Sequence, residues 1–141
     1  MDTAPRRFEA LAVADRDRVV ALAQRILDTV GDDVELLTVP GPATMLVELT
    51  ESVRHQPFHL CEVIVSEASV AVFGRRGDAL VLGADTERAV AAAVCDAAAE
   101  AGVLAGEVAD LVTTTVADRR ERVAARTAAV APTRIELEVL G

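Results

Sequence analysis

Residues 58–102 have the sequence FHLCEVIVSEASVAVFGRRGDALVLGADTERAVAAAVCDAAAEAG, and this stretch decides the fold of the chain. Its first part is rich in β-branched and aromatic side chains, which suit a pleated, half-buried surface. The apolar pattern is rougher than strict alternation, so it predicts one long, bent strand or two strands broken near residues 66–69. Gly74 and Gly77 permit positive φ, and they predict a hairpin loop before a return strand over 79–82.

An alanine-rich helix completes this stretch. Asp85 is a good N-cap and Gly102 a natural C-cap, so we expect a helix over residues 86–101. Its small side chains should let it lie close to the sheet. Asp96 and Glu100 are four residues apart on this helix and repel each other, so we expect them to face solvent or an arginine partner.

Hydrophobic periodicity predicts further elements on both sides of this stretch. The expected helices are an amphipathic segment over 6–14, a helix over 16–30, a short helix that breaks at threonines 113–115, and a helix over 117–130. The expected strands cover 34–39, 45–50 and 133–140, the last either completing the sheet or reaching into a neighbouring subunit. Because the middle of the chain has hairpin-length loops, the expected fold class is α+β: a single domain with an antiparallel β-sheet of about four to six strands and N-terminal, central and C-terminal helices packed on it.

Composition limits the class of partner. The chain has 141 residues, enough for one ordinary domain, and a formal net charge of −9, which argues against nucleic acid or an anionic membrane. Its basic residues are all arginine, so a phosphate site would have to use arginine forks or backbone amides. No apolar signal core follows the first seven residues, and no uncharged apolar run is long enough to span a bilayer. We therefore expect a cytoplasmic protein.

Residue types that perform chemistry are sparse. Cys61 and Cys95 lie far apart and have no metal-ligand spacing, which predicts reduced, buried thiols. His55 and His59 flank a polar loop, and a pair of histidines can serve as metal ligands or acid–base groups. No carboxylate or cysteine cluster accompanies them at ligand spacing, so we expect loop and edge histidines. We therefore predict no metal site, and the catalytic residues stay unknown.

An arginine stripe is the main candidate for binding. Arg119, Arg122 and Arg126 are spaced i, i+3 and i+7, which places them along one side of the helix over 117–130. In an acidic chain such a stripe can bind phosphates or the carboxylates of a partner, or it can simply be a solvated face. Arg134 in the C-terminal strand joins these three as a candidate partner- or phosphate-contacting residue.

Two groups of segments, by their order and spacing, resemble a known family. The first group is Pro57-Phe58-His59-Leu60-Cys61-Glu62-Val63, Val81-Leu82-Gly83-Ala84-Asp85 and Val94-Cys95-Asp96-Ala97. The second group is Ala117-Asp118-Arg119, Arg122-Val123-Ala124-Ala125-Arg126, Val130 and Thr133-Arg134-Ile135-Glu136. With weaker similarity over 7–14 and 39–49, nearly the whole chain resembles the G subunit of the bacterial carbon–phosphorus (C–P) lyase core complex, the PhnG family.

The resemblance implies a role in phosphonate catabolism for a single PhnG-like domain over residues 1–141. Subunits of this family act with partner subunits H, I and L to displace adenine from ATP with a phosphonate, an α-D-ribose 1-methylphosphonate 5-triphosphate synthase activity. The J subunit, a radical SAM iron–sulfur enzyme, later cleaves the carbon–phosphorus bond. The resemblance thus implies a hetero-oligomer, with an isolated homodimer as the second option. It also implies ATP as co-substrate of the complex and no cofactor bound by this chain alone.

The chain departs from the family pattern at two positions. Cys61 stands where glycine is usual, and Glu138 lies where the C-terminal strand usually has aromatics. Both changes are compatible with a divergent member or with a paralogue that lost full complex activity. Three functions therefore stay open: a non-autonomous transferase subunit, a non-catalytic scaffold of the same complex, and a stand-alone binding domain.

Overall fold

A computed structural model of the chain describes residues 3–50, 57–129 and 136–140. The helices and strands within these ranges are α1 (Ala4–Val13), α2 (Arg16–Val30), β1 (Val34–Leu36), β2 (Gly41–Thr50), β3 (Pro57–Val72), β4 (Arg75–Leu82), α3 (Thr86–Ala101), α4 (Ala105–Ala129) and β5 (Glu136–Leu140). The expected α+β class with an antiparallel sheet is confirmed. Strand β1 is shorter than predicted, and β2 begins four residues earlier than predicted.

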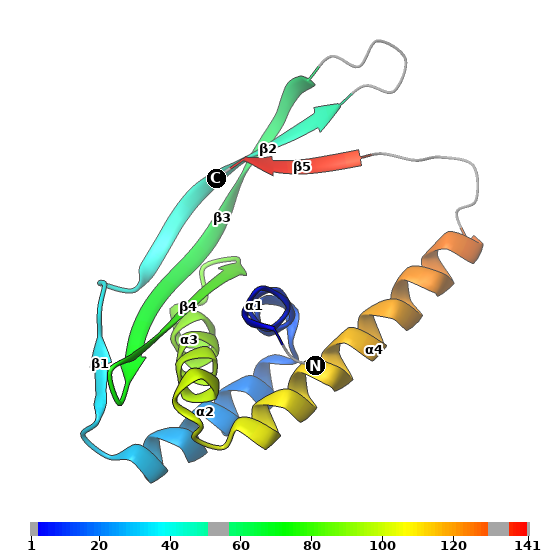
Figure 1. The fold of residues 1–141 in the computed structure, drawn as a ribbon. Helices are drawn as coiled ribbons and strands as arrows, with labels where there is room; N and C mark the ends of the chain where they lie inside the picture. Colours follow the sequence, from blue (N-terminus) through cyan, green and yellow to red (C-terminus); the bar gives the residue numbers. More distant parts are fainter. Residues whose placement is uncertain (1–2, 51–56, 130–135, 141) are drawn as a thin grey trace.

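Strand β3 is the centre of the sheet (Figure 1). It runs for 16 residues without a break, so the prediction of one long strand is the correct alternative. On one side it pairs with β1 and β2, and on the other with β4 over residues 65–72. Strand β5 pairs with β2 of the same chain, so the C-terminal strand completes the sheet.

The turn between β3 and β4 is tighter than the sequence predicts. It consists of Phe73 and Gly74 alone, with φ of 48° and 75°. Two central residues with positive φ are typical of a type I′ turn, whose twist matches that of the flanking strands. The prediction of a loop is therefore wrong for the residues after Gly74, because β4 begins at Arg75 and includes Gly77.

Gly77 allows the alanine-rich helix α3 to approach the sheet closely. A Cβ atom at this position would lie 2.2 Å from the backbone nitrogen of Ala97 and 2.4 Å from the carbonyl oxygen of Ala93. Both distances are far inside van der Waals contact, so only glycine fits here. Helix α3 packs on β3 and β4, with α2 against its other side. Its caps are as predicted, Asp85 at the N-terminus and left-handed Gly102 at the C-terminus.

A buried ion network joins α1 to this layer. Arg7 is only 6% exposed, and its Nε donates to Asp96 Oδ1 at 2.6 Å. Its Nη2 forms an ion pair with Glu100, and Asp96 Oδ2 accepts a hydrogen bond from the backbone nitrogen of Asp78 at 3.0 Å. Burial disfavours the charge of Arg7, but hydrogen bonds to Asp96 and Glu100 outweigh it, so the pKa of Arg7 rises. Asp96 and Glu100 thus pair with an arginine, which is one of the two alternatives that the sequence predicted.

Helix α4 is continuous where the sequence predicts a break. Residues 113–115 lie inside it, and Thr115 is buried with its Oγ1 donating to the carbonyl oxygen of Leu111 at 2.7 Å. Burial of neighbouring Val108 and Val112 in the core outweighs the low helix propensity of the threonines. The helix packs against α1, α2 and α3 rather than on the sheet (Figure 1). Within the described ranges, no helix combines the length and apolarity needed to cross a membrane.

We predict that Gly77→Ala destabilises the chain. The added methyl group collides with the backbone of α3, which cannot move without disturbing the whole layer. Overpacking of this kind costs about 1–3 kcal/mol or more. Gly41→Ala is the control, because a Cβ there would meet nothing within 4 Å. Urea unfolding measures both variants, and equal free energies of unfolding would contradict the close approach.

The N-cap of α3 should make stability depend on pH. Hydrogen bonds from Arg16 and from the backbone N–H of Arg88 lower the pKa of Asp85 below its ordinary value of 3.8. A lowered pKa means that the charged carboxylate stabilises the fold above pH 3.8 and that this contribution is lost as the pH falls further.

Asp85→Asn keeps a good N-cap but removes this titration. We expect the difference in unfolding free energy between wild type and this variant to be constant from pH 7 to 5 and to shrink near pH 3. Arg16→Gln should weaken the same pH dependence, because it removes the cation that lowers the pKa. A difference that does not change with pH would contradict the role of Asp85.

Candidate functional site

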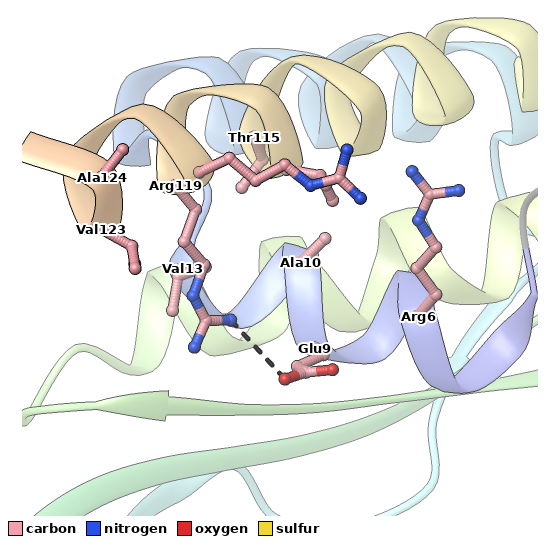
Figure 2. Close-up of a pocket in the computed structure, with 10 residues that line it drawn as sticks. Arg6, Glu9, Ala10, Val13, Thr115, Arg119, Val123 and Ala124 are labelled. Carbon is pink, nitrogen blue, oxygen red and sulfur yellow. Dashed lines mark ion pairs between the residues drawn. The ribbon is translucent and has the colours of Figure 1, made fainter. Parts of the chain in front are cut away.

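A groove of about 470 Å³ lies between α1 and the middle of α4 (Figure 2). We call it the α1–α4 groove; its lining residues are Arg6, Glu9, Ala10, Val13, Thr115, Val116, Arg119, Arg120, Val123 and Ala124. Alanine and valine side chains supply an apolar surface, and Val13 and Val123 lie together at one end of it (Figure 2).

Charged side chains surround this apolar surface. Arg119 reaches from α4 across the groove, and its Nη1 lies 3.6 Å from Glu9 Oε1 (Figure 2). Both side chains are more than half exposed, at 56% and 72%, so water screens the pair. With Arg6 and Arg120, three arginines face one glutamate, which leaves a formal charge of +2 around the groove.

A more polar pocket of about 400 Å³ adjoins the groove and shares four lining residues with it, Val13, Thr115, Arg119 and Val123. We call it the arginine pocket, after the four arginines that line it: Arg18 of α2 and Arg119, Arg122 and Arg126 of α4. Asp15 and Asp118 also line it, so its formal charge is +2 in a chain whose net charge is −9. Asp15 is engaged as the N-cap of α2, accepting a hydrogen bond from the backbone nitrogen of Arg18 at 3.0 Å.

The structure brings the predicted arginine stripe together. Arg119, Arg122 and Arg126 line one pocket, and within the described residues the last two form no ion pair. Arg134 lies outside the described residues. Sequence reasoning missed Arg18, which lies in the first turn of α2. Only the packing of α2 beside α4 places it at the pocket.

The half of α4 that bears these arginines is exposed along its length in the described part of the chain, although Arg119 pairs with Glu9 of α1. Every residue from 117 to 128 is exposed, including Val123 at 54%. The preceding half buries Val108, Leu111 and Val112. Most helical stability in proteins comes from packing an apolar face, so the exposed half lacks its usual source of stability. Figure 1 shows this end of α4 extending beyond α1 and α2.

The cysteines and histidines provide no comparable site in the described part. Cys95 is free and buried, as predicted, and burial raises the pKa of its thiol to about 12. His55 lies outside the described residues, as do the side chains of His59 and Cys61. Among the described side chains, no three of His, Cys, Asp and Glu lie close enough to hold a metal ion.

The sequence model of the family described as "Phosphonate metabolism protein PhnG" matches residues 4–141, nearly the whole chain. No curated protein matches the sequence.

We predict that the pair between Arg119 and Glu9 adds little to folding. A double-mutant cycle with Arg119→Gln and Glu9→Gln should give a coupling energy of about 0–1 kcal/mol, because both side chains are exposed. Arg7→Gln is the contrasting variant, since it leaves Asp96 buried without its cation, at a cost of about 3–5 kcal/mol. Urea unfolding measures all of them. A cost for Arg119→Gln similar to that of Arg7→Gln would mean that Arg119 has a structural role.

Proposed function

The chain belongs to the PhnG family of phosphonate metabolism proteins, and we propose that it is a non-autonomous transferase subunit. In this proposal it acts with partner subunits of the H, I and L types to transfer the ribose triphosphate of ATP to a phosphonate. A phosphonate oxygen forms the new bond to the ribose, the bond between the ribose and adenine breaks, and adenine leaves. The product is α-D-ribose 1-methylphosphonate 5-triphosphate when methylphosphonate is the acceptor, and a J-type subunit acts on it later.

The arginine pocket is the observation that supports this proposal. A triphosphate bears several negative charges, and guanidinium groups bind phosphate oxygens through two parallel hydrogen bonds. Arg18, Arg122 and Arg126 present such groups to one cavity of an otherwise acidic chain. We therefore assign to this chain the binding of the triphosphate, or of the phosphonate, at the edge of a site completed by its partners.

The exposed half of α4 supports the non-autonomous part of the proposal. The pocket is lined largely by α4, whose residues from 117 to 128 are all exposed in the described chain. A partner that covers this helix would both stabilise it and enclose the pocket. ATP enters as co-substrate of the assembled complex rather than as a cofactor of this chain alone, and we place the reaction in the cytoplasm, where ATP is available.

A scaffold is the second candidate function. The same arginines can pair with carboxylates of a partner, and Val123 is an exposed aliphatic side chain beside them. In that case the chain would hold the complex together and contact neither ATP nor the phosphonate.

Charge reversal in the arginine pocket separates the two functions. In the complex reconstituted with H-, I- and L-type subunits, Arg122→Glu with Arg126→Glu should reduce adenine release from ATP and methylphosphonate at least about tenfold, because charged hydrogen bonds to phosphate are lost. Size-exclusion chromatography should show that the complex still assembles. Arg75→Glu, at an exposed arginine of β4, is the matched control and should leave both properties unchanged.

Two results would contradict the transferase proposal. If the double reversal prevents assembly, and any activity loss follows only from that, the scaffold function is supported instead. If the isolated wild-type chain releases adenine from ATP at the rate of the complex, the chain does not depend on partners.

A further inference from the structure

We infer that the α1–α4 groove is the docking site for an acidic, amphipathic helix of a partner subunit. This inference rests on the proposed function in one respect, that the chain works as a subunit of a complex. It goes further by assigning the surface and the chemistry of the segment that occupies it.

The apolar surface of the groove is suited to a protein partner. Val13 is 43% exposed and Val123 is 54% exposed, and they belong to different helices that meet at one end of the groove (Figure 2). Val116 and Ala124 of α4 also line the groove. A partner that covers these side chains removes apolar area from water, which is the main favourable term in protein association.

The charges around the groove indicate that the partner segment is negatively charged. Arg6, Arg119 and Arg120 outnumber Glu9, whereas the chain as a whole has a net charge of −9. An acidic segment is therefore repelled by most of this protein and attracted to the groove. Complementary charge of this kind fixes the orientation of an interface and suppresses wrong contacts.

The shape of the groove favours a helix as occupant. Two helices, α1 and α4, form its walls, and a third helix can pack against such a pair at an ordinary interaxial distance of about 8–10 Å. The uncovered half of α4, residues 117–128, is about 18 Å long at 1.5 Å per residue, which corresponds to about three turns. A docked amphipathic helix of that length presents apolar anchors at i, i+3 or i+4, and i+7.

A second copy of this chain is a poor fit for the same groove. Residues 117–128 contain Arg119, Arg120, Arg122 and Arg126 against Asp118 and Glu121, a formal charge of +2. Pairing two such helices would bring like charges together, whereas an acidic helix in the groove would neutralise Arg119 and Arg120, the two arginines of α4 that line it. Docking in the groove also leaves Arg18 and Arg126 accessible, because both line the arginine pocket and neither lines the groove.

A matched pair of variants tests the apolar part of this interface. Val123→Asp places a carboxylate among apolar side chains at the groove and should weaken binding to the partner subunits about tenfold or more. Phe73→Asp is the control, since Phe73 has nearly equal exposure, 55%, but lies in the turn between β3 and β4. Titration of the H-, I- and L-type subunits, followed by light scattering, measures the dissociation constants. The urea midpoint of isolated Val123→Asp should equal that of wild type, because the side chain is exposed.

A second measurement identifies the occupant. Replacing Val123 with the photo-crosslinking residue p-benzoylphenylalanine should join this position to a partner peptide whose acidic and apolar residues alternate with helical spacing. Arg120→Glu should weaken the same complex, with Arg75→Glu as its control. Crosslinking of Val123 to a second copy of this chain, to a peptide without helical acidic spacing, or to none of the subunits would overturn the inference. Assembly of Val123→Asp with wild-type affinity would also overturn it.

The results also separate this inference from the proposed function. A complex that depends on Val123 but releases no adenine supports the docking site and rejects the transferase function. A complex that releases adenine, and that Val123→Asp leaves intact, supports the transferase function and rejects the docking site.

Discussion

The close approach of α3 to β4 at Gly77 is the constraint on which the rest of the structure depends. A glycine in the strand and alanines in the helix bring the two backbones together, with no room for a single additional carbon atom. This approach places Asp96 where it accepts a hydrogen bond from the backbone of β4 and also receives Arg7. Helix α1 is therefore fixed beside α3 by a buried charge network, and its position determines one wall of the α1–α4 groove.

The second feature that shapes the molecule is the exposed second half of α4. Small residues of α1, α2, α3, β3, β4 and the first half of α4 fill the core, and the second half of α4 stays exposed in the described part. Four arginines lie on that half, together with Val123. An uncovered helix with cations and an aliphatic side chain is typical of a surface completed by another protein, and it agrees with the membership of this chain in a family of phosphonate metabolism proteins.

Local signals were sufficient for much of the fold, and long-range contacts account for the rest. Asp85 and Gly102 bound α3 because capping depends on neighbouring residues alone. The arginine stripe of α4 was predicted from helical spacing. In contrast, Gly77 was interpreted as a turn residue, because nothing in the sequence indicates that a helix crosses it. The break at residues 113–115 was predicted from propensity, which burial of that turn overrides. Arg18 reaches the pocket only through the packing of α2.

Hydrogen exchange along α4, with and without the partner subunits, is the most direct test of the central claim that this chain is completed by another protein. In the isolated chain, we expect the amides of residues 117–128 to exchange far faster than those of the buried residues 91–98 of α3. In the complex, the exchange of residues 117–128 should slow by about tenfold or more, while α3 stays unchanged. Equal protection of both segments in the isolated chain, or no slowing of residues 117–128 in the complex, would contradict the claim.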